Sequence, residues 1–335
     1  MLPPHSLWPR WTGQAPDDGE DLELPYRLLS HHGFEVRRID TFGLPWNPAV
    51  RTNPVLCAID PLRALGVLLF RRRTAVVLCM FESSGLLLLL RRLLRFRAKV
   101  VVLDVGGTGW RLRRLVQDRV VPQADAVLVY SAHQAGIVRA TWPGARRVWP
   151  VLAQVDCRFF QAAPDCPDGP VLAVGDDASR DFPTLLQAAE GLGRQVLIRT
   201  GRSVDATPSN VTVLAQPLPM PGYRDLVASA SIVVLPLHPC DTPGGVSALV
   251  QAMESGKALV VSASPGVAEY VQDGVDGLVV PPHDFVALRA AILRLLDDHA
   301  LRQRLGAAAR RTAEARFSLE AWSAQLAAVL DDVAG

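Results

Sequence analysis

The sequence predicts an α/β protein made of two doubly wound domains with parallel sheets. Short apolar runs recur along the chain and alternate with helix-like segments, which is the pattern of such sheets. Several runs end at a loop rich in glycine or proline, as parallel strands do at the edge where ligands bind. The length of 335 residues suits two ordinary domains, and the 49% of hydrophobic residues is enough to form two cores.

The first domain is expected to span residues 1–160. Buried runs rich in valine and leucine predict its strands at 75–80, 98–103, 126–130 and 147–152. Helices are predicted at 21–32, 61–70 and 86–97. Two more are predicted, one that begins at 110 and one that follows Ser131 and ends at 140. In the segment 86–97 leucines are followed by arginines. Both a core helix with a basic end and a helix lying on a membrane surface fit that pattern.

A Pro- and Asp-rich stretch, 161–169, is the predicted linker, and the second domain is expected to span 170–317. Its strands are predicted at 170–174, 196–199, 211–214, 232–235, 258–261 and 278–280. Its helices are predicted at 182–190, 223–230, 246–255, 284–297 and 301–315. A last helix, 318–333, completes the chain.

The net charge of +2 is unevenly distributed. Residues 1–150 hold 21 Arg and Lys against 12 Asp and Glu, and the remaining residues are acidic overall. A basic half favours an anionic partner such as a phosphate-linked lipid or a membrane surface, although ordinary solvated arginines explain it equally well. Neither a signal peptide, an apolar run long enough to span a membrane, nor a zinc spacing is recognisable, and the five cysteines suit a reducing compartment.

The stretch 231–282 reads as strand, glycine loop, helix and strand. Gly244 and Gly245 open the helix, at the edge of the sheet where the preceding strand ends. Backbone N–H groups at a helix N-terminus attract anions, and glycines let a phosphate approach closely. The sequence therefore predicts a phosphate site at this turn.

This stretch resembles the nucleotide-binding half of retaining glycosyltransferases with the GT-B fold, of the family-four-like, group 1 type. The matching motifs are Gly244-Gly245, the run from Gln251 to Lys257, Pro265-Gly266 followed by Glu269, and Asp273-Gly274 with Gly277. The resemblance implies two Rossmann-like domains facing a central cleft. The N-terminal domain would bind the acceptor, the C-terminal domain would bind a nucleotide-diphosphate sugar, and residues 318–335 would pack back on the N-terminal domain.

The resemblance also implies roles in donor binding. Arg180 aligns with a family lysine that clamps the diphosphate, although a surface arginine paired with Asp181 would fit as well. Two family glutamates, seven residues apart, are replaced here by Pro243 and Gln251. Gln251 would still contact the ribose. The other donor-binding candidates are Gly244, Gly245 and Ser247 of the turn, Asp241 as a substitute carboxylate, and Glu269, which would contact the donor or cap its own helix.

Catalysis is assigned to residues at strand ends. Asp104 and Glu82 follow neighbouring strands, and there they would position the acceptor and stabilise positive charge on the sugar. Arg180 would stabilise the leaving diphosphate. Front-face attack needs no strong base, because the leaving phosphate takes the proton of the acceptor.

The expected activity is retaining transfer of a sugar to a saccharide or a lipid-linked acceptor in cell-envelope glycan synthesis. No cofactor or metal ion is expected, and no nucleic acid partner. The expected location is the cytoplasm, with peripheral contact at the inner face of the membrane left open. The alternatives are a catalytically inactive GT-B module that binds a nucleotide or serves as a scaffold, and a nucleotide-sugar epimerase of the same fold.

Overall fold

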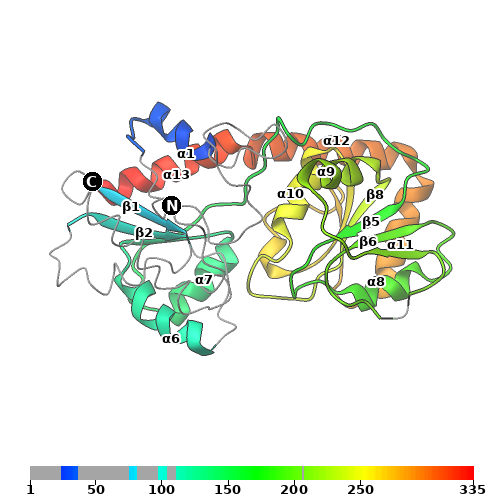
Figure 1. Cartoon of the computed structure of the whole chain (residues 1–335), viewed down its shortest axis with the longest axis horizontal. Coiled ribbons are helices and arrows are strands. Elements are labelled where there is room, and N and C mark those ends of the chain that lie inside the picture. The colour runs from blue at the N-terminus through cyan, green and yellow to red at the C-terminus, as the bar shows by residue number, and fades with distance from the viewer. Residues whose placement is uncertain (1–23, 37–74, 81–96, 104–110, 206) are drawn as a thin grey trace. The chain divides into compact units, whose positions relative to one another are not determined.

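The computed structural model describes residues 24–36, 75–80, 97–103, 111–205 and 207–335. The chain divides into two compact units (Figure 1). One unit holds the described residues between 25 and 152 together with Ser323–Gly335, and the other holds Ala153–Trp322. Each unit is described by itself.

The first unit contains a four-stranded parallel sheet in the order β1-β2-β3-β4. The strands are β1 (Val76–Met80), β2 (Lys99–Leu103), β3 (Ala126–Val129) and β4 (Val148–Pro150). All four strands were predicted from their apolar runs. Its described helices are α1 (Leu24–Leu28), the 3-10 turn η1 (Leu29–His32), α6 (Arg111–Val120), the 3-10 turn η3 (Val121–Gln123) and α7 (Ala132–Thr141). The predicted helices at 61–70 and 86–97 lie outside the described residues.

The second unit contains a six-stranded parallel sheet in the order β10-β9-β8-β5-β6-β7. Its strands are β5 (Val171–Val174), β6 (Val196–Arg199), β7 (Val211–Leu214), β8 (Ile232–Leu235), β9 (Ala258–Ser262) and β10 (Leu278–Val280). The chain runs outward from β5 to β7 and then returns to build β8 to β10 on the other side of β5. This is the doubly wound order, and its direction reverses between β5 and β8.

Helices cover both faces of this second sheet (Figure 1), as the complete burial of β8 requires. They are α8 (Phe182–Ala189), α9 (Met220–Ser229), α10 (Val246–Glu254), α11 (Phe285–Asp297) and α12 (His299–Arg316), with a 3-10 turn η4 (Pro265–Val267). Most of the last helix, α13 (Leu319–Ala334), belongs to the first unit, which holds the residues from Ser323 onward. Side chains of α8, α11 and α12 join alternate residues of the strands in one core cluster. Alternation places successive side chains on opposite faces.

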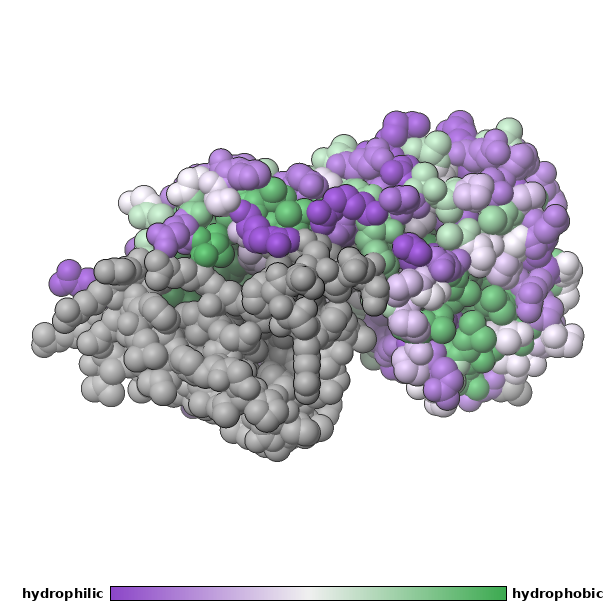
Figure 2. All heavy atoms as spheres, turned by 45° about the horizontal axis from the view of Figure 1, so that its top comes forward, coloured by the Kyte–Doolittle hydropathy of each residue, from purple (hydrophilic) through white to green (hydrophobic). Residues whose placement is uncertain are grey.

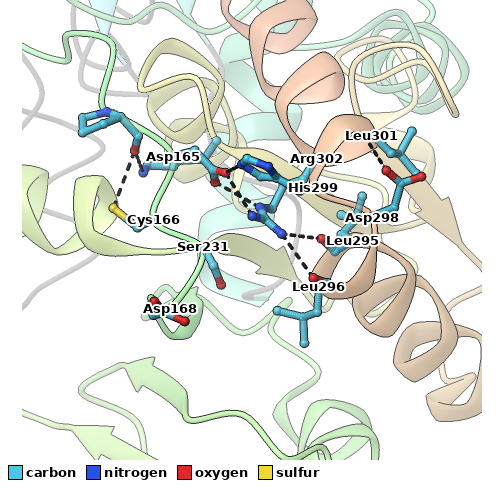
Figure 3. Close-up of polar contacts among 12 residues, drawn as sticks. Asp165, Cys166, Asp168, Ser231, Leu295, Leu296, Asp298, His299, Leu301 and Arg302 are labelled. Carbon is cyan, nitrogen blue, oxygen red and sulfur yellow. Dashed lines mark hydrogen bonds and ion pairs between the residues drawn. The ribbon is translucent and has the colours of Figure 1, made fainter.

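The expected linker segment is anchored to α12 by a buried arginine (Figure 3). Arg302 Nη2 and Nε lie 2.9 and 3.0 Å from the two carboxylate oxygens of Asp165, while Nη1 donates to the carbonyl of Leu295 at 2.8 Å. His299 contacts the same carboxylate at 2.5 Å. Hydrogen bonding by Arg302 holds the pKa of Asp165 below its usual value. Through this ion pair the segment 161–169 is attached to the second unit.

Helices α10 and α12 pack closely because Gly306 has no side chain. A Cβ at Gly306 would collide with the carbonyl oxygen of Gly256, just past the end of α10. Gly256 itself has φ +70°, which closes the helix in the left-handed conformation. The two glycines therefore fix how α12 lies across the end of α10.

The visible face of the second unit is largely hydrophilic, with a smaller apolar group among its polar residues (Figure 2). Within the described ranges, no helix is both long and apolar enough to cross a membrane.

Candidate functional site

The candidate site lies at the switch point of the second sheet, where strand order reverses between β5 and β8. In open α/β sheets the loops at such a point part from each other and leave a crevice at the carboxyl ends of the strands. Here the two loops are residues 175–181 and 236–245. They are tied together, because Arg180 forms a bridge with Leu237 and the His238 N–H donates to the Ser179 carbonyl at 2.8 Å.

Arg180 is the central side chain of this site. Its side chain is only 2% exposed, and Nε lies 3.0 Å from Oδ2 of Asp177. Despite that ion pair, neither Nε nor Nη1 has a hydrogen-bond partner of good geometry within the described part of the chain. Buried polar groups are normally paired, so donors without a partner call for a ligand or another explanation. The alternative of a surface arginine paired with Asp181 is wrong, since Arg180 is buried and pairs with Asp177.

The guanidinium of Arg180 packs against backbone that has no side chains. A Cβ on Gly175 would overlap Nε of Arg180, and a Cβ on Gly245 would lie 2.6 Å from Nη1. Gly245 is the N-cap residue of α10 with φ +79°, and in the described ranges no side chain caps this helix. A Cβ on the preceding Gly244 would collide with Ser179. The glycine pair therefore brings the guanidinium and the positive end of α10 together.

A second cation, which the sequence reasoning missed, stands at the end of β6. Arg199 Nη1 lies 2.6 Å from Oδ2 of Asp176, and the Arg199 carbonyl accepts from the Gly175 N–H at 3.1 Å. Burial would raise the pKa of Asp176, but hydrogen bonds from the Gly201 N–H and from Arg199 hold it below the usual value. The pairing of β6 with β5 places Arg199 beside the loop of residues 175–181.

The remaining donor candidates surround the start of α10. Ser247 is exposed in the first turn, Gln251 is half-buried one turn further along the helix, and Asp241 is exposed in the loop before it. Glu269 follows η4, whose Gly266 packs so tightly on the Pro243 backbone that a Cβ would lie 2.6 Å from the Pro243 Cα. The Glu269 side chain borders a hollow of about 520 Å³ that is also lined by Thr312 and Arg316.

Residues 209–312 match the family described as glycosyl transferases group 1. A D-inositol 3-phosphate glycosyltransferase of Kribbella flavida is 30% identical over 159 residues, which are 48% of this chain and 34% of that protein. An alpha-D-kanosaminyltransferase of Streptomyces kanamyceticus is 30% identical over 178 residues, or 53% of this chain and 38% of that protein. The matched segments thus cover little more than a third of each relative.

Solved structures resemble nearly the whole chain in fold. A sucrose-phosphate synthase from Thermosynechococcus elongatus has a TM-score of 0.74 at 18% identity, and the match covers 96% of each chain. The Anabaena protein HepE, solved in complex with UDP, has a TM-score of 0.66 at 16% identity over 92% of this chain and 89% of that one. The chain therefore has the GT-B-like fold that its motifs predicted.

The structure does not test the residues predicted to position the acceptor. Glu82 and Asp104 both lie outside the described residues. The structure does bring together several predicted donor-site residues: Arg180, Gly244 and Gly245 meet at the carboxyl edge, with Ser247 and Asp241 on the neighbouring helix turn and loop.

One further cluster lies beside Arg180. Asp181, the N-cap residue of α8, holds its carboxylate near two imidazoles, those of His238 and His283. The sequence reasoning found no metal spacing among the histidines, because these three residues come from loops far apart in the chain and only the sheet order brings them together.

Proposed function

We propose that this protein is a glycosyltransferase whose second unit binds the diphosphate of a nucleotide-sugar donor at Arg180 and the start of α10. The observation that carries the proposal is the buried guanidinium packed against the Gly245 backbone. Within the described residues its Nε and Nη1 lack a hydrogen-bond partner of good geometry, although Nε lies 3.0 Å from Asp177. Two oxygens of one phosphate group can accept paired hydrogen bonds from an arginine side chain, which suits a diphosphate at this position.

The chemistry follows from where charge develops. When the bond between the anomeric carbon and the diphosphate breaks, negative charge builds on the leaving phosphate oxygens. Arg180 and the N–H groups of the first turn of α10 are fixed donors aimed at that charge, which is the most effective form of transition-state stabilisation. Arg199 adds a second positive charge on the neighbouring strand end.

The names of the relatives support the same reading. Both curated relatives are glycosyltransferases, and HepE was solved with UDP, so uracil nucleotide sugars are the first donors to test. A saccharide or lipid-linked acceptor, retention of configuration, and a place in envelope glycan synthesis are the finer parts of the proposal. Positioning of the acceptor by Asp104 and Glu82, and substitution of a family carboxylate by Asp241, stay predictions.

Thermal unfolding in a panel of nucleotides and nucleotide sugars tests donor binding. A ligand at 100 times its dissociation constant adds about 2.7 kcal/mol of stability, which is readily detected. Arg180→Ala is expected to lose the shift and Arg180→Lys to keep part of it. Arg304→Ala is the control, because Arg304 is exposed and makes only long contacts of 3.4 Å to the Gly274 carbonyl. A panel that shifts wild type and Arg180→Ala equally would reject the proposal.

A catalytically inactive nucleotide-binding module is the second candidate. It is favoured by Pro243 and Gln251, which stand where the family resemblance has two glutamates. Slow hydrolysis of the bound donor separates the two candidates, since an active site commonly releases some sugar to water and an inactive module does not. Donor binding without any hydrolysis or transfer would favour the inactive module over the enzyme.

A further inference from the structure

Asp181, His238 and His283 form a cluster of metal-ligand type at the carboxyl edge of the second sheet. Their ligand atoms all lie within 4.8 Å of one another. Nδ1 of His283 is 2.8 Å from Oδ2 of Asp181, and Nδ1 of His238 is 3.8 Å from the same oxygen. The two imidazole rings are 5.0 Å apart between centroids and tilted by 36°.

We propose that these three side chains bind a divalent transition-metal ion of the zinc class. Two ligands at ~2.0–2.1 Å from a tetrahedral ion lie roughly 3.3 Å apart. The two distances to Oδ2 fall on either side of that value, so small side-chain rotations bring both imidazoles and the carboxylate onto one ion. Two imidazole nitrogens and a carboxylate oxygen suit zinc, cobalt or nickel, whereas magnesium prefers oxygen ligands alone.

The carboxylate is held in place before any ion arrives. Asp181 has a side chain only 3% exposed. It accepts hydrogen bonds from the N–H and the hydroxyl of Thr184 at 3.2 and 2.7 Å, and its own N–H donates to the Pro236 carbonyl at 2.9 Å. Such contacts orient a ligand in the way that outer partners do in protein metal sites.

The two histidines are presented by rigid backbone and remain open to solvent. His238 is fixed through its N–H bond to Ser179. His283 has φ +61° and is the one non-glycine residue with positive φ in the described ranges; it directly precedes Asp284, which caps α11. Their side chains are 42% and 55% exposed. An ion can therefore reach the cluster from solvent and keep a water molecule as its fourth ligand.

Binding of the metal ion is expected to release protons from its ligands. Zinc binds the neutral imidazole and the ionised carboxylate, so any proton held by these three side chains passes to solvent when the ion binds. The ion would join the ends of β8 and β10 to the start of α8, one residue away from Arg180. This inference stands on its own and does not depend on the proposed donor.

Calorimetric titration of the full chain with ZnCl₂, after treatment with a chelator and with the thiols reduced, tests the site. One equivalent is expected to bind to wild type, with release of protons seen as a dependence of the heat on the buffer. Co²⁺ is expected to give the visible absorption of a tetrahedral site, and Mg²⁺ is expected to leave the unfolding temperature unchanged.

Two ligand variants and one control complete the test. His283→Gly removes a ligand and relieves the positive φ, so it is expected to fold without difficulty, and His238→Gln keeps a polar side chain. Each is expected to lower zinc affinity at least tenfold. Cys240→Ser is the control, because the Cys240 thiol contacts the Thr242 carbonyl at 2.8 Å instead of the cluster. Failure of wild type to bind zinc, or undiminished affinity in the double histidine variant, would overturn the proposal.

Discussion

Substitution of Gly245 by alanine separates backbone strain from damage to the donor site. Gly245 has φ +79°, where a residue with a Cβ costs roughly 1–2 kcal/mol, partly offset because alanine restricts the unfolded chain. The new Cβ would also lie 2.6 Å from Nη1 of Arg180. The guanidinium would have to retreat by at least about 0.8 Å to reach an ordinary contact distance.

The matched control is Gly256→Ala at the other end of α10. Gly256 has φ +70° and nothing within 4 Å of the added Cβ, so it suffers backbone strain without a clash. Both variants are expected to lose about 1 kcal/mol of stability from strain, measured by urea unfolding. Only Gly245→Ala is expected to weaken donor binding, by roughly ten- to a hundredfold if one hydrogen bond from the charged guanidinium is lost. Equal nucleotide affinity in the two variants would refute the reasoning.

Three further changes test packing and charge. Arg302→Ala removes both bonds to the linker carboxylate and is expected to cost about 2–3 kcal/mol in urea unfolding, because Asp165 is partly exposed and keeps its contact with His299; a loss under 1 kcal/mol would contradict the buried geometry. Burial raises the pKa of Glu254 to about 7, so the folded state keeps a proton that the unfolded state releases near its ordinary value of 4.5, and stability falls as pH rises between the two. Glu254→Gln is therefore expected to match wild type near pH 4.5 and to be more stable by roughly 3 kcal/mol above pH 7, whereas parallel pH profiles would exclude that titration. Gly306→Ala places a Cβ against the Gly256 carbonyl oxygen and is expected to lower the free energy of unfolding by ~1–3 kcal/mol. Its control is Gly136→Ala in α7, where the added Cβ has nothing within 4 Å, and this change is expected to raise stability by up to about 1 kcal/mol.

The central strands of the second sheet, β5, β8 and β9, could be predicted because they are buried on both faces. A run such as 232–235 is apolar throughout, and no alternation with polar residues blurs its ends. The helix at 246–254 was predicted equally well, since Gly245 and Gly256 mark its two ends. The predicted anion site depends on the same glycines, because a φ above zero and close packing are conditions that glycine meets most readily.

The side chains that the sheet order assembles could not be predicted from local pattern. In the sequence Arg199 looks like the polar end of a short strand. Only the pairing of β6 with β5 places it beside the loop of residues 175–181. Asp181, His238 and His283 are each an ordinary loop residue, and their meeting depends on three separate connections at one edge. Burial of Arg180 was also missed, because it depends on the tight packing of Gly175 and Gly245.

The most direct test of the donor site is the ratio of the dissociation constants for UMP and UDP, measured by calorimetry in wild type and in Arg180→Ala. In the proposed function Arg180 contacts the phosphate that UDP has and UMP lacks, so wild type is expected to bind UDP more tightly than UMP by roughly ten- to a hundredfold. In Arg180→Ala the ratio is expected to fall close to one, with UMP affinity little changed. An equal preference for UDP in both proteins, or equal loss of both nucleotides, would contradict the assignment of Arg180 to the diphosphate.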